Sequence, residues 1–387
     1  MSKNESDKGS MARRLSFRLL VGVCRALLLG WCLVQFGLMT AHASEYSPGI
    51  SYPSTKANGM GGAFLAMPQE EWSPFYNPSW IGNQRDVKLS LLNAEAQGTK
   101  SWISGEGKFK QDLSKRASLL SSGNGGDFSS SVGAFPHVRL WKFIFGVNYR
   151  DRREAWAPSG TGNRLHYEAS RDLSYIGGFG LRFFRGLIQI GGVAKYLMRA
   201  ETPAQLVEDT SLLGVESLSY KSEVRTGRVW TGDAGVSLVF PWAALPTFTA
   251  VVRNLGSRHF KQGSVSQAEA SSSEAPLDLV EQVDLGFGMS PWLAKKLRLR
   301  LSFDYFDVRN DLNVDDQERF HAGMEFAYAR SIFLRGGYSH GGPSFGFGVD
   351  VKGIKLDFAY YEQRRFDSDL NQEDKSKRYA MSFGVEF

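Results

Sequence analysis

LRLRLSFDY, residues 297–305, alternates strictly between large apolar side chains and charged or small polar ones. Successive side chains of a β-strand point to opposite faces, so this stretch would present one apolar and one polar face. The same two-residue period recurs at 283–289, 320–328 and 356–361. Together these stretches predict a sheet in which each strand separates an apolar environment from a polar one.

Residues 1–43 differ from the rest of the chain. Residues 13–18 carry three arginines, residues 26–34 are apolar, and Ala41-His42-Ala43 supplies a small-residue cleavage pattern. This order is typical of a secretory signal peptide, which we expect to be cleaved before Ser44. The alternative is an uncleaved membrane anchor.

The predicted signal peptide also determines what the cysteines and the net charge can mean. Both cysteines, Cys24 and Cys32, lie within it, so the mature chain would have no disulfide framework. It carries six of the 46 Lys/Arg residues and two of the 40 Asp/Glu residues, which leaves 40 basic and 38 acidic residues. The net charge of +6 is therefore no argument for nucleic-acid binding. Met1 and Met11 are alternative start residues.

After residue 43 no apolar stretch is long enough for a membrane-spanning helix. The strands of a transmembrane barrel are only half apolar, since lipid-facing and lumen-facing residues alternate. We therefore predict an all-β fold, a transmembrane antiparallel β-barrel of about 14 strands at residues 86–387. The alternatives are a soluble β-sandwich, which also alternates, and a barrel of 12 or 16 strands.

The predicted strands are joined by connections that are long and short in turn, as the short periplasmic turns and longer outer loops of such barrels require. Both chain ends would then lie on the periplasmic side. The strands are expected at 86–95, 129–137, 140–150, 174–184, 187–199, 228–240, 247–254, 280–289, 296–307, 319–329, 331–339, 344–351, 354–364 and 377–387.

The last residues, 379–387, alternate up to a terminal aromatic residue, Phe387. They resemble the C-terminal strand by which bacterial outer-membrane proteins are recognised by their assembly machinery. The resemblance implies the bacterial outer membrane as the location. It also implies outer-membrane lipid and the assembly machinery as partners.

Residues 56–82 contain two turn motifs before the predicted barrel. The first has Gly59, Gly61 and Gly62, in the order G-M-G-G-A-F, and the second is Asn77-Pro78-Ser79. A glycine-rich phosphate site would need a preceding strand, a following helix and usually a lysine, and none is evident. We therefore discount a nucleotide site.

The two motifs resemble the beginning of the FadL/PorV-like outer-membrane protein family, in which the second turn usually has Ala where this chain has Ser79. Further echoes of the family occur at 253–256, 304–308 and 334–338. In the fatty-acid-transporting branch, a plug fills a 14-strand barrel, and hydrophobic molecules bind near it and leave sideways into the membrane. The resemblance implies a plug at residues 44–85.

The resemblance also suggests which apolar plug residues would contact a hydrophobic small-molecule ligand. The alternative is that they only pack the plug against the barrel, as aromatic surface more often does. Pro136 lies inside a predicted strand and removes one ladder hydrogen bond, so it could mark a lateral exit or only a strand end. The implied ligand-binding residues are Met60, Phe64, Leu65, Met67, Phe75 and Tyr76, with Trp72 and Trp80 as further apolar surface.

Polar residues of the alternating strands are expected in the lumen, where ion pairing is their expected role. No catalytic or metal-binding residues are predicted, because none of the five histidines of the mature chain has metal-ligand spacing. An outer-membrane lipase or protease is a minor alternative. The expected lumen charges are Arg298, Arg300, Asp304, Glu325, Arg335, Asp357 and Glu386.

The leading function is thus an outer-membrane channel for uptake of hydrophobic molecules such as long-chain fatty acids, without a cofactor and without enzymatic activity. The alternative is a PorV-like barrel that binds or hands over secreted proteins. A plugged barrel of 14 strands argues against a third possibility, a wide aqueous porin.

Overall fold

The computed structural model describes residues 54–68, 71–83, 86–103, 127–156, 165–207, 224–266, 270, 272–339, 341–367 and 372–387. All of them belong to one compact unit, His42–Phe387. The predicted signal peptide and most of the long connections lie outside the described residues. Their assignment stays a prediction.

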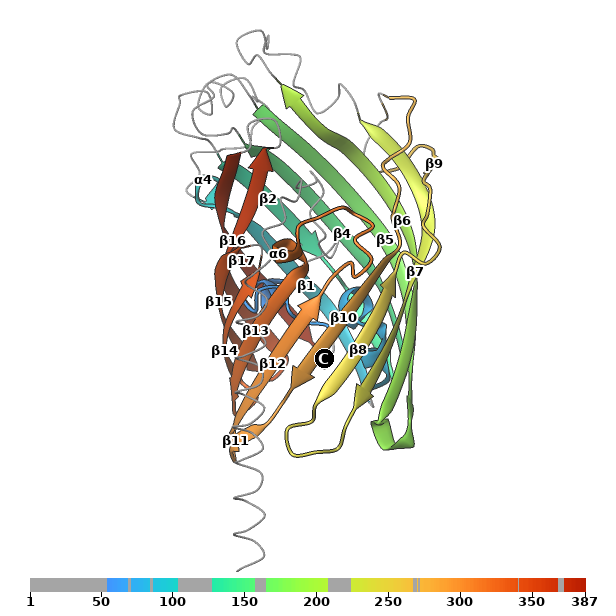
Figure 1. Cartoon of the computed structure of the whole chain (residues 1–387). Coiled ribbons are helices and arrows are strands. Elements are labelled where there is room, and N and C mark those ends of the chain that lie inside the picture. Colours follow the sequence, from blue (N-terminus) through green and yellow to red (C-terminus); the bar gives the residue numbers. More distant parts are fainter. Residues whose placement is uncertain are drawn as a thin grey trace, which may run out of the picture. The chain divides into compact units, whose positions relative to one another are not determined.

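The described part of the chain is mainly β-strand, with a few helices of one or two turns (Figure 1). The first strands are β1 (Val87–Thr99), β2 (Asp127–Ala134), β3 (His137–Leu140), β4 (Phe143–Trp156), β5 (Leu165–Phe183), β6 (Ile188–Val207), β7 (Arg225–Val239), β8 (Thr247–Arg253) and β9 (Lys261–Gln262). The others are β10 (Gln282–Met289), β11 (Trp292–Ala294), β12 (Leu297–Tyr305), β13 (Phe320–Tyr328), β14 (Ile332–Ser339), β15 (Gly342–Val351), β16 (Ile354–Asp367) and β17 (Gln372–Glu386). The helices are α2 (Thr55–Asn58), α3 (Ser73–Tyr76), η1 (Pro78–Asn83), α4 (Lys100–Ile103), η2 (Phe184–Gly186) and α6 (Asp316–Arg319).

The strands form one antiparallel sheet that closes on itself, because β1 pairs with β17 as well as with β2 and β3. β2 and β3 are two parts of one barrel strand, since both lie between β1 and β4. β9 and β11 are short additions, which leaves 14 barrel strands. The predicted all-β barrel of about 14 strands is confirmed.

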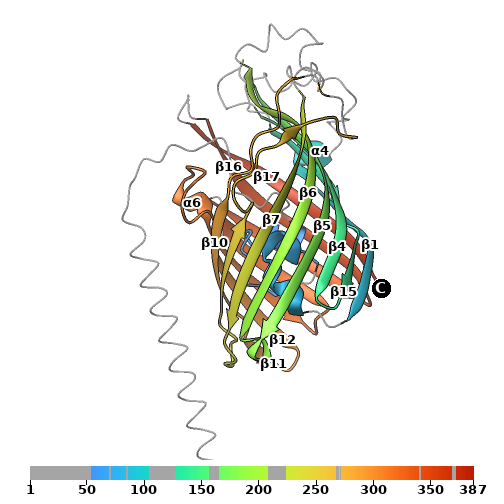
Figure 2. The ribbon, with the colours of Figure 1, turned by 90° about the vertical axis from the view of Figure 1, so that its right-hand side faces the viewer.

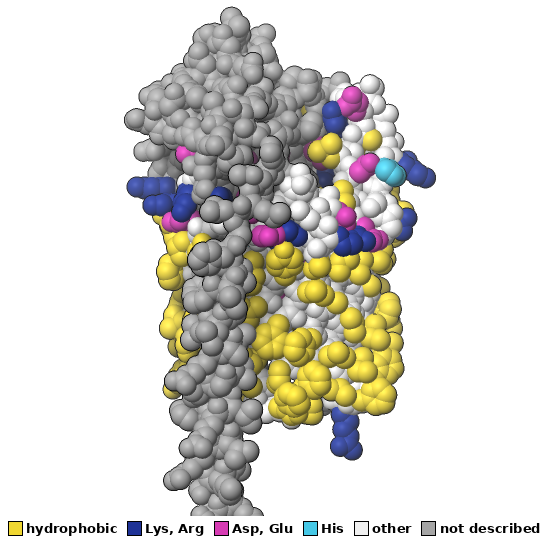
Figure 3. All heavy atoms as spheres, viewed as in Figure 1, with side chains coloured by type: hydrophobic (Ala, Val, Ile, Leu, Met, Phe, Trp, Pro, Cys, Tyr) yellow, Lys and Arg dark blue, Asp and Glu magenta, His cyan; other side chains and the backbone are white. Residues whose placement is uncertain are grey.

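The two faces of each strand meet different surroundings, as the alternation predicts. In β12 the pairs with β13 place Ser302 and Asp304 on the buried inner face, whereas Leu301 and Phe303 face outward. Outward-facing apolar side chains form a broad band around the barrel, and charged side chains begin above it (Figure 3). Such a band is what lipid contact requires of a barrel exterior. None of the described helices is long and apolar enough to cross a membrane.

Several strands extend farther toward the long connections than the sequence pattern indicates. β5 begins at Leu165 and β6 ends at Val207, whereas the alternation predicts strands at 174–184 and 187–199. In this extension Asp151 and Arg171, on neighbouring strands, form an ion pair on the outward face. Above the apolar band both faces are polar, so the backbone pairing continues after the alternation has ended.

The boundary between the second and third barrel strands also differs from the prediction. The turn lies at Trp141 and Lys142 rather than at residues 138–139. Trp141 has a φ of 51°, in the left-handed region, where an aromatic residue gives no sequence signal for a turn. Pro136 interrupts the second barrel strand between its two parts, β2 and β3, and does not lie at the end of that strand.

Candidate functional site

Residues 54–83, here called the plug, lie inside the barrel; residues 69 and 70 are not described (Figure 2). The plug helix α2 contacts β15, β16 and β17, and η1 contacts β4 to β7 on the other side. Nearly every described plug residue is buried. The segment thus connects two opposite sectors of the wall, the name used here for the barrel strands.

Five of the six predicted ligand-binding residues come together in one apolar cluster, and Leu65 does not. Met60, Phe64, Met67, Phe75 and Tyr76 pack together and against the wall residues Phe135, Ile144, Ile176 and Val193. Leu65 packs instead with Val251 and Phe306. All six side chains are at most 2% exposed. In this structure these side chains therefore pack against one another and against the barrel, and their ligand-binding role stays a prediction.

The first turn motif lies directly against the backbone of β13, β14 and β15. Gly61 and Gly62 have φ values of 64° and 76°, a conformation that favours glycine. A Cβ on Gly61 would lie 2.6 Å from the backbone of Tyr338, and one on Gly59 would lie 2.9 Å from Gly346. The motif is thus required by this turn and by its close approach to the wall.

The wall has glycines of its own where the plug touches it. A Cβ on Gly323 or Gly337 would lie within 2.3 Å of the Met60 backbone, and one on Gly191 would lie 2.1 Å from the Pro78 carbonyl oxygen. These glycines point into the barrel on alternating strand positions. Their small size lets the plug backbone reach the wall.

The second turn motif is fixed by the side chain of Asn77. Its Nδ2 shares its two hydrogens among three acceptors, the Leu65 carbonyl at 2.9 Å, Ser237 Oγ at 3.1 Å and Thr249 Oγ1 at 2.7 Å. Its Oδ1 accepts from the backbone N–H and from the hydroxyl of Ser79, at 3.1 and 2.8 Å. Every polar atom of this buried amide therefore has a partner, as burial demands.

Wall residues also bind plug backbone groups that the short plug helices leave unpaired. Asp304 on β12 accepts hydrogen bonds from the backbone N–H groups of Phe64 and Leu65. Nδ1 of His321 lies 2.6 Å from the carbonyl oxygen of Gly61. Arg253 donates to the carbonyl groups at the end of α3 and forms an ion pair with Asp284. These contacts give hydrogen-bond partners to buried N–H and C=O groups, whose burial without partners would cost free energy.

A chain of ion pairs continues from the wall into the plug. Its wall part runs from Arg300 to Glu325 and Arg335, and from Arg335 to Asp357 at 2.6 Å. Arg300, Glu325, Arg335 and Asp357 are thus paired as expected. Of the other expected lumen charges, Arg298 donates to the Ser290 carbonyl at 3.3 Å and Asp304 binds plug N–H groups, rather than forming ion pairs.

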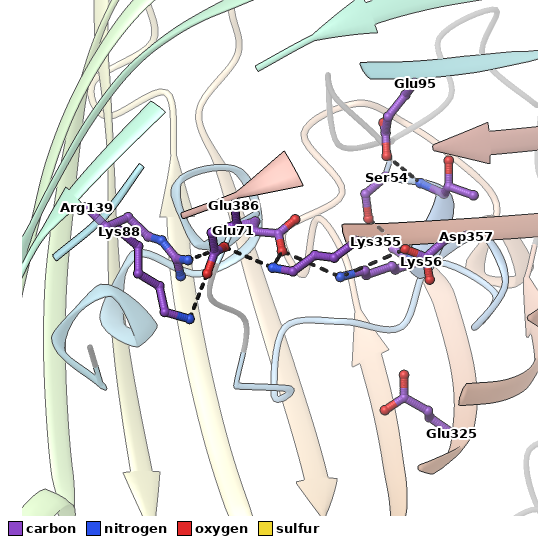
Figure 4. Close-up of polar contacts among 12 residues, drawn as sticks. Ser54, Lys56, Glu71, Lys88, Glu95, Arg139, Glu325, Lys355, Asp357 and Glu386 are labelled. Atoms are coloured by element: carbon purple, nitrogen blue, oxygen red, sulfur yellow. Dashed lines mark hydrogen bonds and ion pairs between the residues drawn. The ribbon is translucent and has the colours of Figure 1, made fainter. Parts of the chain in front are cut away.

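The plug enters the chain through Lys56 and Glu71, as Figure 4 shows. Lys56 lies 3.9 Å from Asp357 and 3.8 Å from Glu71. Glu71 pairs with Lys355, which lies 2.9 Å from Glu386. Glu386 in turn pairs with Lys88 at 2.7 Å and with Arg139, so one network joins the plug to both strands of the closing seam and to β3.

The wall departs from regular pairing at Phe135 and Pro136, next to the apolar cluster. β1 pairs Ala94 with Ala134 but Ser90 with His137, so three β1 residues lie opposite two. Phe135 turns inward, with its ring 4.9 Å from Phe75 and 5.9 Å from Trp72. The irregular segment of the wall is thus filled by aromatic side chains of the plug and of the wall itself.

Within the described part of the chain, no three His, Cys, Asp or Glu side chains are grouped closely enough to hold a metal ion. The contacts that the sequence did not assign are those between wall and plug. Their only sequence signal is that the echoes at 253–256, 304–308 and 334–338 contain wall residues that touch the plug or continue its ion pairs, namely Arg253, Asp304, Arg335 and Gly337.

No protein-family model matches the chain, and no curated protein matches it. Solved structures do. The deltaS2S3 mutant of TodX, a monoaromatic hydrocarbon channel, has a TM-score of 0.54 at 12% identity, over 86% of this chain and 99% of that one; TodX is from Pseudomonas putida. CymD, another monoaromatic hydrocarbon channel, has a TM-score of 0.50 at 11% identity, over 87% of this chain and 97% of that one. A FadL homologue from Pseudomonas aeruginosa has a TM-score of 0.42 at 10% identity, over 87% and 98%. The chain thus has the same barrel fold as the TodX and CymD channels.

Proposed function

We propose that this chain is a channel for hydrophobic molecules in the bacterial outer membrane. The observation that carries the proposal is the irregular wall segment at Phe135 and Pro136, where the apolar plug cluster meets the wall. Directly outside it, Leu91 and Leu92 are 60% and 44% exposed on the lipid-facing surface. A molecule that leaves the cluster at this point would pass from an apolar interior to lipid without crossing water.

Passage requires movement, because the cluster is packed. We propose that Phe135 and the plug residues Trp72 and Phe75 separate to let a molecule through. Pro136 favours this place, since it has no N–H to donate to a neighbouring strand and the local pairing is already incomplete. Over their described residues, the ladders β6–β7, β15–β16 and β16–β17 are regular and show no such interruption.

The proposed class of ligand rests on the apolar plug cluster and on the proteins of similar fold. The cluster consists of aromatic and aliphatic side chains, which suit either an acyl chain or an aromatic ring. TodX and CymD are monoaromatic hydrocarbon channels, and long-chain fatty acids are the ligand that the sequence resemblance implies. Both belong to the proposed class.

One observation favours the second candidate, a PorV-like barrel that binds or hands over secreted proteins. The interior around Phe64 and Tyr76 is fully packed, as a barrel without a transported ligand would be. The two functions differ in whether the plug must move relative to the wall.

A reversible cross-link tests this difference. The centroids of the Phe75 and Phe135 rings lie 4.9 Å apart, so in the double variant Phe75→Cys/Phe135→Cys a short bifunctional methanethiosulfonate reagent would connect plug and wall through disulfides that a reductant cleaves. Uptake of a labelled long-chain fatty acid and of labelled toluene is measured in cells that produce the double variant, before cross-linking, after it and after reduction. The single variant Phe135→Cys, treated identically, controls for the reagent and for the lost ring.

We expect uptake to fall to the level of cells without the protein when the cross-link forms, and to return on reduction. The labelled compound that is taken up identifies the ligand class. Uptake that is equal with and without the cross-link would refute passage at Phe135. If the protein supports no uptake of either compound and co-purifies with a secreted protein, the second candidate replaces the first.

A further inference from the structure

The short connections at one end of the barrel carry an unusual set of charges. Six of them join β3 to β4, β5 to β6, β7 to β8, β10 to β12, β13 to β14 and β15 to β16. All but the β7–β8 connection contribute exposed cationic residues, in the turn itself or on the strand beside it. These residues, here called the cationic rim, are Lys142, Arg182, Arg185, Lys295, Lys296, Arg330 and Lys352.

The cationic rim has no acidic counterpart among the described residues. Within the described part of the chain, no carboxylate forms an ion pair with any of its seven side chains, and Asp86 is the one exposed acidic residue described at this end. The opposite end is different, because Arg153 and Arg171 both pair with Asp151, and Arg309 pairs with Glu281 and Asp311. Cations near the long connections are thus interspersed with carboxylates, whereas the cations of the rim are not.

Exposed aromatic side chains accompany the rim. Trp141, Phe184 and Trp242 are 61%, 75% and 65% exposed on three of the short connections, and Trp292 and Tyr328 lie beside two others. Aromatic residues at the edge of an apolar band mark the level of lipid headgroups, where one side of the ring is apolar and the other wet. The rim thus lies at headgroup height, and a cationic side chain protrudes below the apolar band in Figure 3.

We propose that the cationic rim binds the phosphate groups of anionic phospholipids in the leaflet that surrounds the short connections. A negatively charged lipid surface attracts Lys and Arg side chains within about a Debye length, roughly 8 Å at physiological salt. The rim cations are exposed and adjacent to aromatic side chains that enter the same headgroup layer. The inference concerns the outer surface and is independent of what passes through the barrel.

The distribution of the rim favours lipid over an acidic protein. The cations come from five connections spread around the barrel from β3 to β16, rather than from one sector. A protein docked on one side would use neighbouring connections, whereas lipid surrounds the whole circumference. Each cation or pair of cations is also accompanied by apolar side chains that face lipid, such as Ile354 next to Lys352 and Leu293 next to Lys295.

The experiment uses the complete barrel in vesicles that contain a brominated lipid, which quenches nearby tryptophan fluorescence. Quenching by brominated phosphatidylglycerol and by brominated phosphatidylcholine gives the relative binding constant of the anionic lipid. The rim variant replaces Lys142, Arg182, Lys295 and Lys296 with Gln, and Arg185, Arg330 and Lys352 with Asn, because the last three have left-handed φ values. The control variant neutralises exposed cations near the long connections, namely Arg228, Lys261, Lys375 and Lys377.

We expect phosphatidylglycerol to bind the unchanged barrel about threefold more tightly than phosphatidylcholine, with a ratio that falls toward one as salt is added. The rim variant should give a ratio near one at low salt, and the control variant should keep the original ratio. The salt titration of the unchanged protein tests the proposal even if the rim variant fails to fold. A ratio of one for the unchanged barrel, or an equal loss in the control variant, would overturn it.

Discussion

The two ends of the plug are fixed to opposite sectors of the wall by different chemistry. The first anchor comprises Gly59–Gly62, the backbone of residues 64 and 65, and the ion pairs of Lys56 and Glu71, with β12 to β17 as its partners. The second comprises residues 77–83, where an amide and hydroxyl groups make the contacts with β7 and β8. Both use wall glycines for close approach. Among the described residues, charged plug side chains take part only at the first, so the anchors should respond differently to perturbation.

The largest effect is expected for Arg335→Met, which breaks the ion pairs behind the first anchor. Arg335 is buried and donates to Glu325 at 2.7 Å and to Asp357 at 2.6 Å. Its loss leaves the buried Glu325 with Arg300 alone and the buried Asp357 with Lys56 alone, at 3.9 Å, which should lower the free energy of unfolding by about 4 kcal/mol. Guanidinium unfolding of the barrel in lipid vesicles measures this change.

Arg309→Met is the matched control for that experiment. Arg309 also joins two carboxylates, those of Glu281 and Asp311, but its side chain is 47% exposed. We expect a loss of no more than about 1 kcal/mol, because water screens exposed ion pairs. Equal losses of unfolding free energy in the two variants would mean that the buried ion pairs behind the first anchor stabilise the protein no more than exposed ones do.

The next largest effect is expected where the plug backbone touches the wall. Gly337→Ala places a Cβ 2.2 Å from the Met60 backbone, which cannot move like the end of a side chain. We expect a destabilisation of about 3 kcal/mol and faster hydrogen exchange in residues 54–68. Gly336→Ala is the control on the same strand, where the nearest atoms would lie 3.9 Å away. A plug that exchanges at the same rate in both variants would show that close contact at Gly337 is dispensable.

Asn77→Ala tests whether the second anchor can open alone. The substitution removes the amide that binds the Leu65 carbonyl, Ser237 and Thr249, at an expected cost of about 2 kcal/mol. Hydrogen exchange followed by mass spectrometry should show faster exchange in residues 77–83, while residues 55–62 stay protected. An equal increase in both segments would contradict the division into two anchors and make the plug one cooperative unit.

The sequence predicts the wall better than the contacts of the plug, for a physical reason. A lipid-facing strand must alternate locally, so LRLRLSFDY identifies β12 without knowledge of any other segment. The bonds from Asp304 to the N–H groups of Phe64 and Leu65 connect residues about 240 positions apart. No local period encodes such a pairing. Glycine at alternating inward positions is a further signal besides the family echoes, and it does not tell which plug residue lies opposite.

The predicted ligand-binding residues show the same limit of what the sequence pattern predicts. Apolar character selects Met60, Phe64 and Tyr76 correctly as interior residues, but it does not distinguish packing from binding, and they are packed. Phe135 was not selected, although it lies in the same cluster and the alternation of its strand, in which Gly133, His137 and Arg139 are also buried, directs it inward. Alternation gives the direction of a wall side chain but not the plug residue that it meets.

The smallest effect is expected at Ser79, where this chain departs from the alanine usual in the resembled family. Its hydroxyl donates to Asn77 Oδ1 at 2.8 Å, so the hydrogen bond of 2.6 Å between Ser79 and Ser237 must be donated by Ser237. Asn77 Nδ2 in turn donates to Ser237, which closes a ring of three hydrogen bonds. Ser79→Ala should cost about 1 kcal/mol, since two bonds of the ring are lost, the one that Ser79 donates to Asn77 and the one that it accepts from Ser237. In a double-mutant cycle with Ser237→Ala, we expect a coupling energy of roughly 0.5–1 kcal/mol, because each hydroxyl polarises the other. A coupling energy of zero would mean that Ser79 only fills space, and the second anchor would then consist of the Asn77 amide alone.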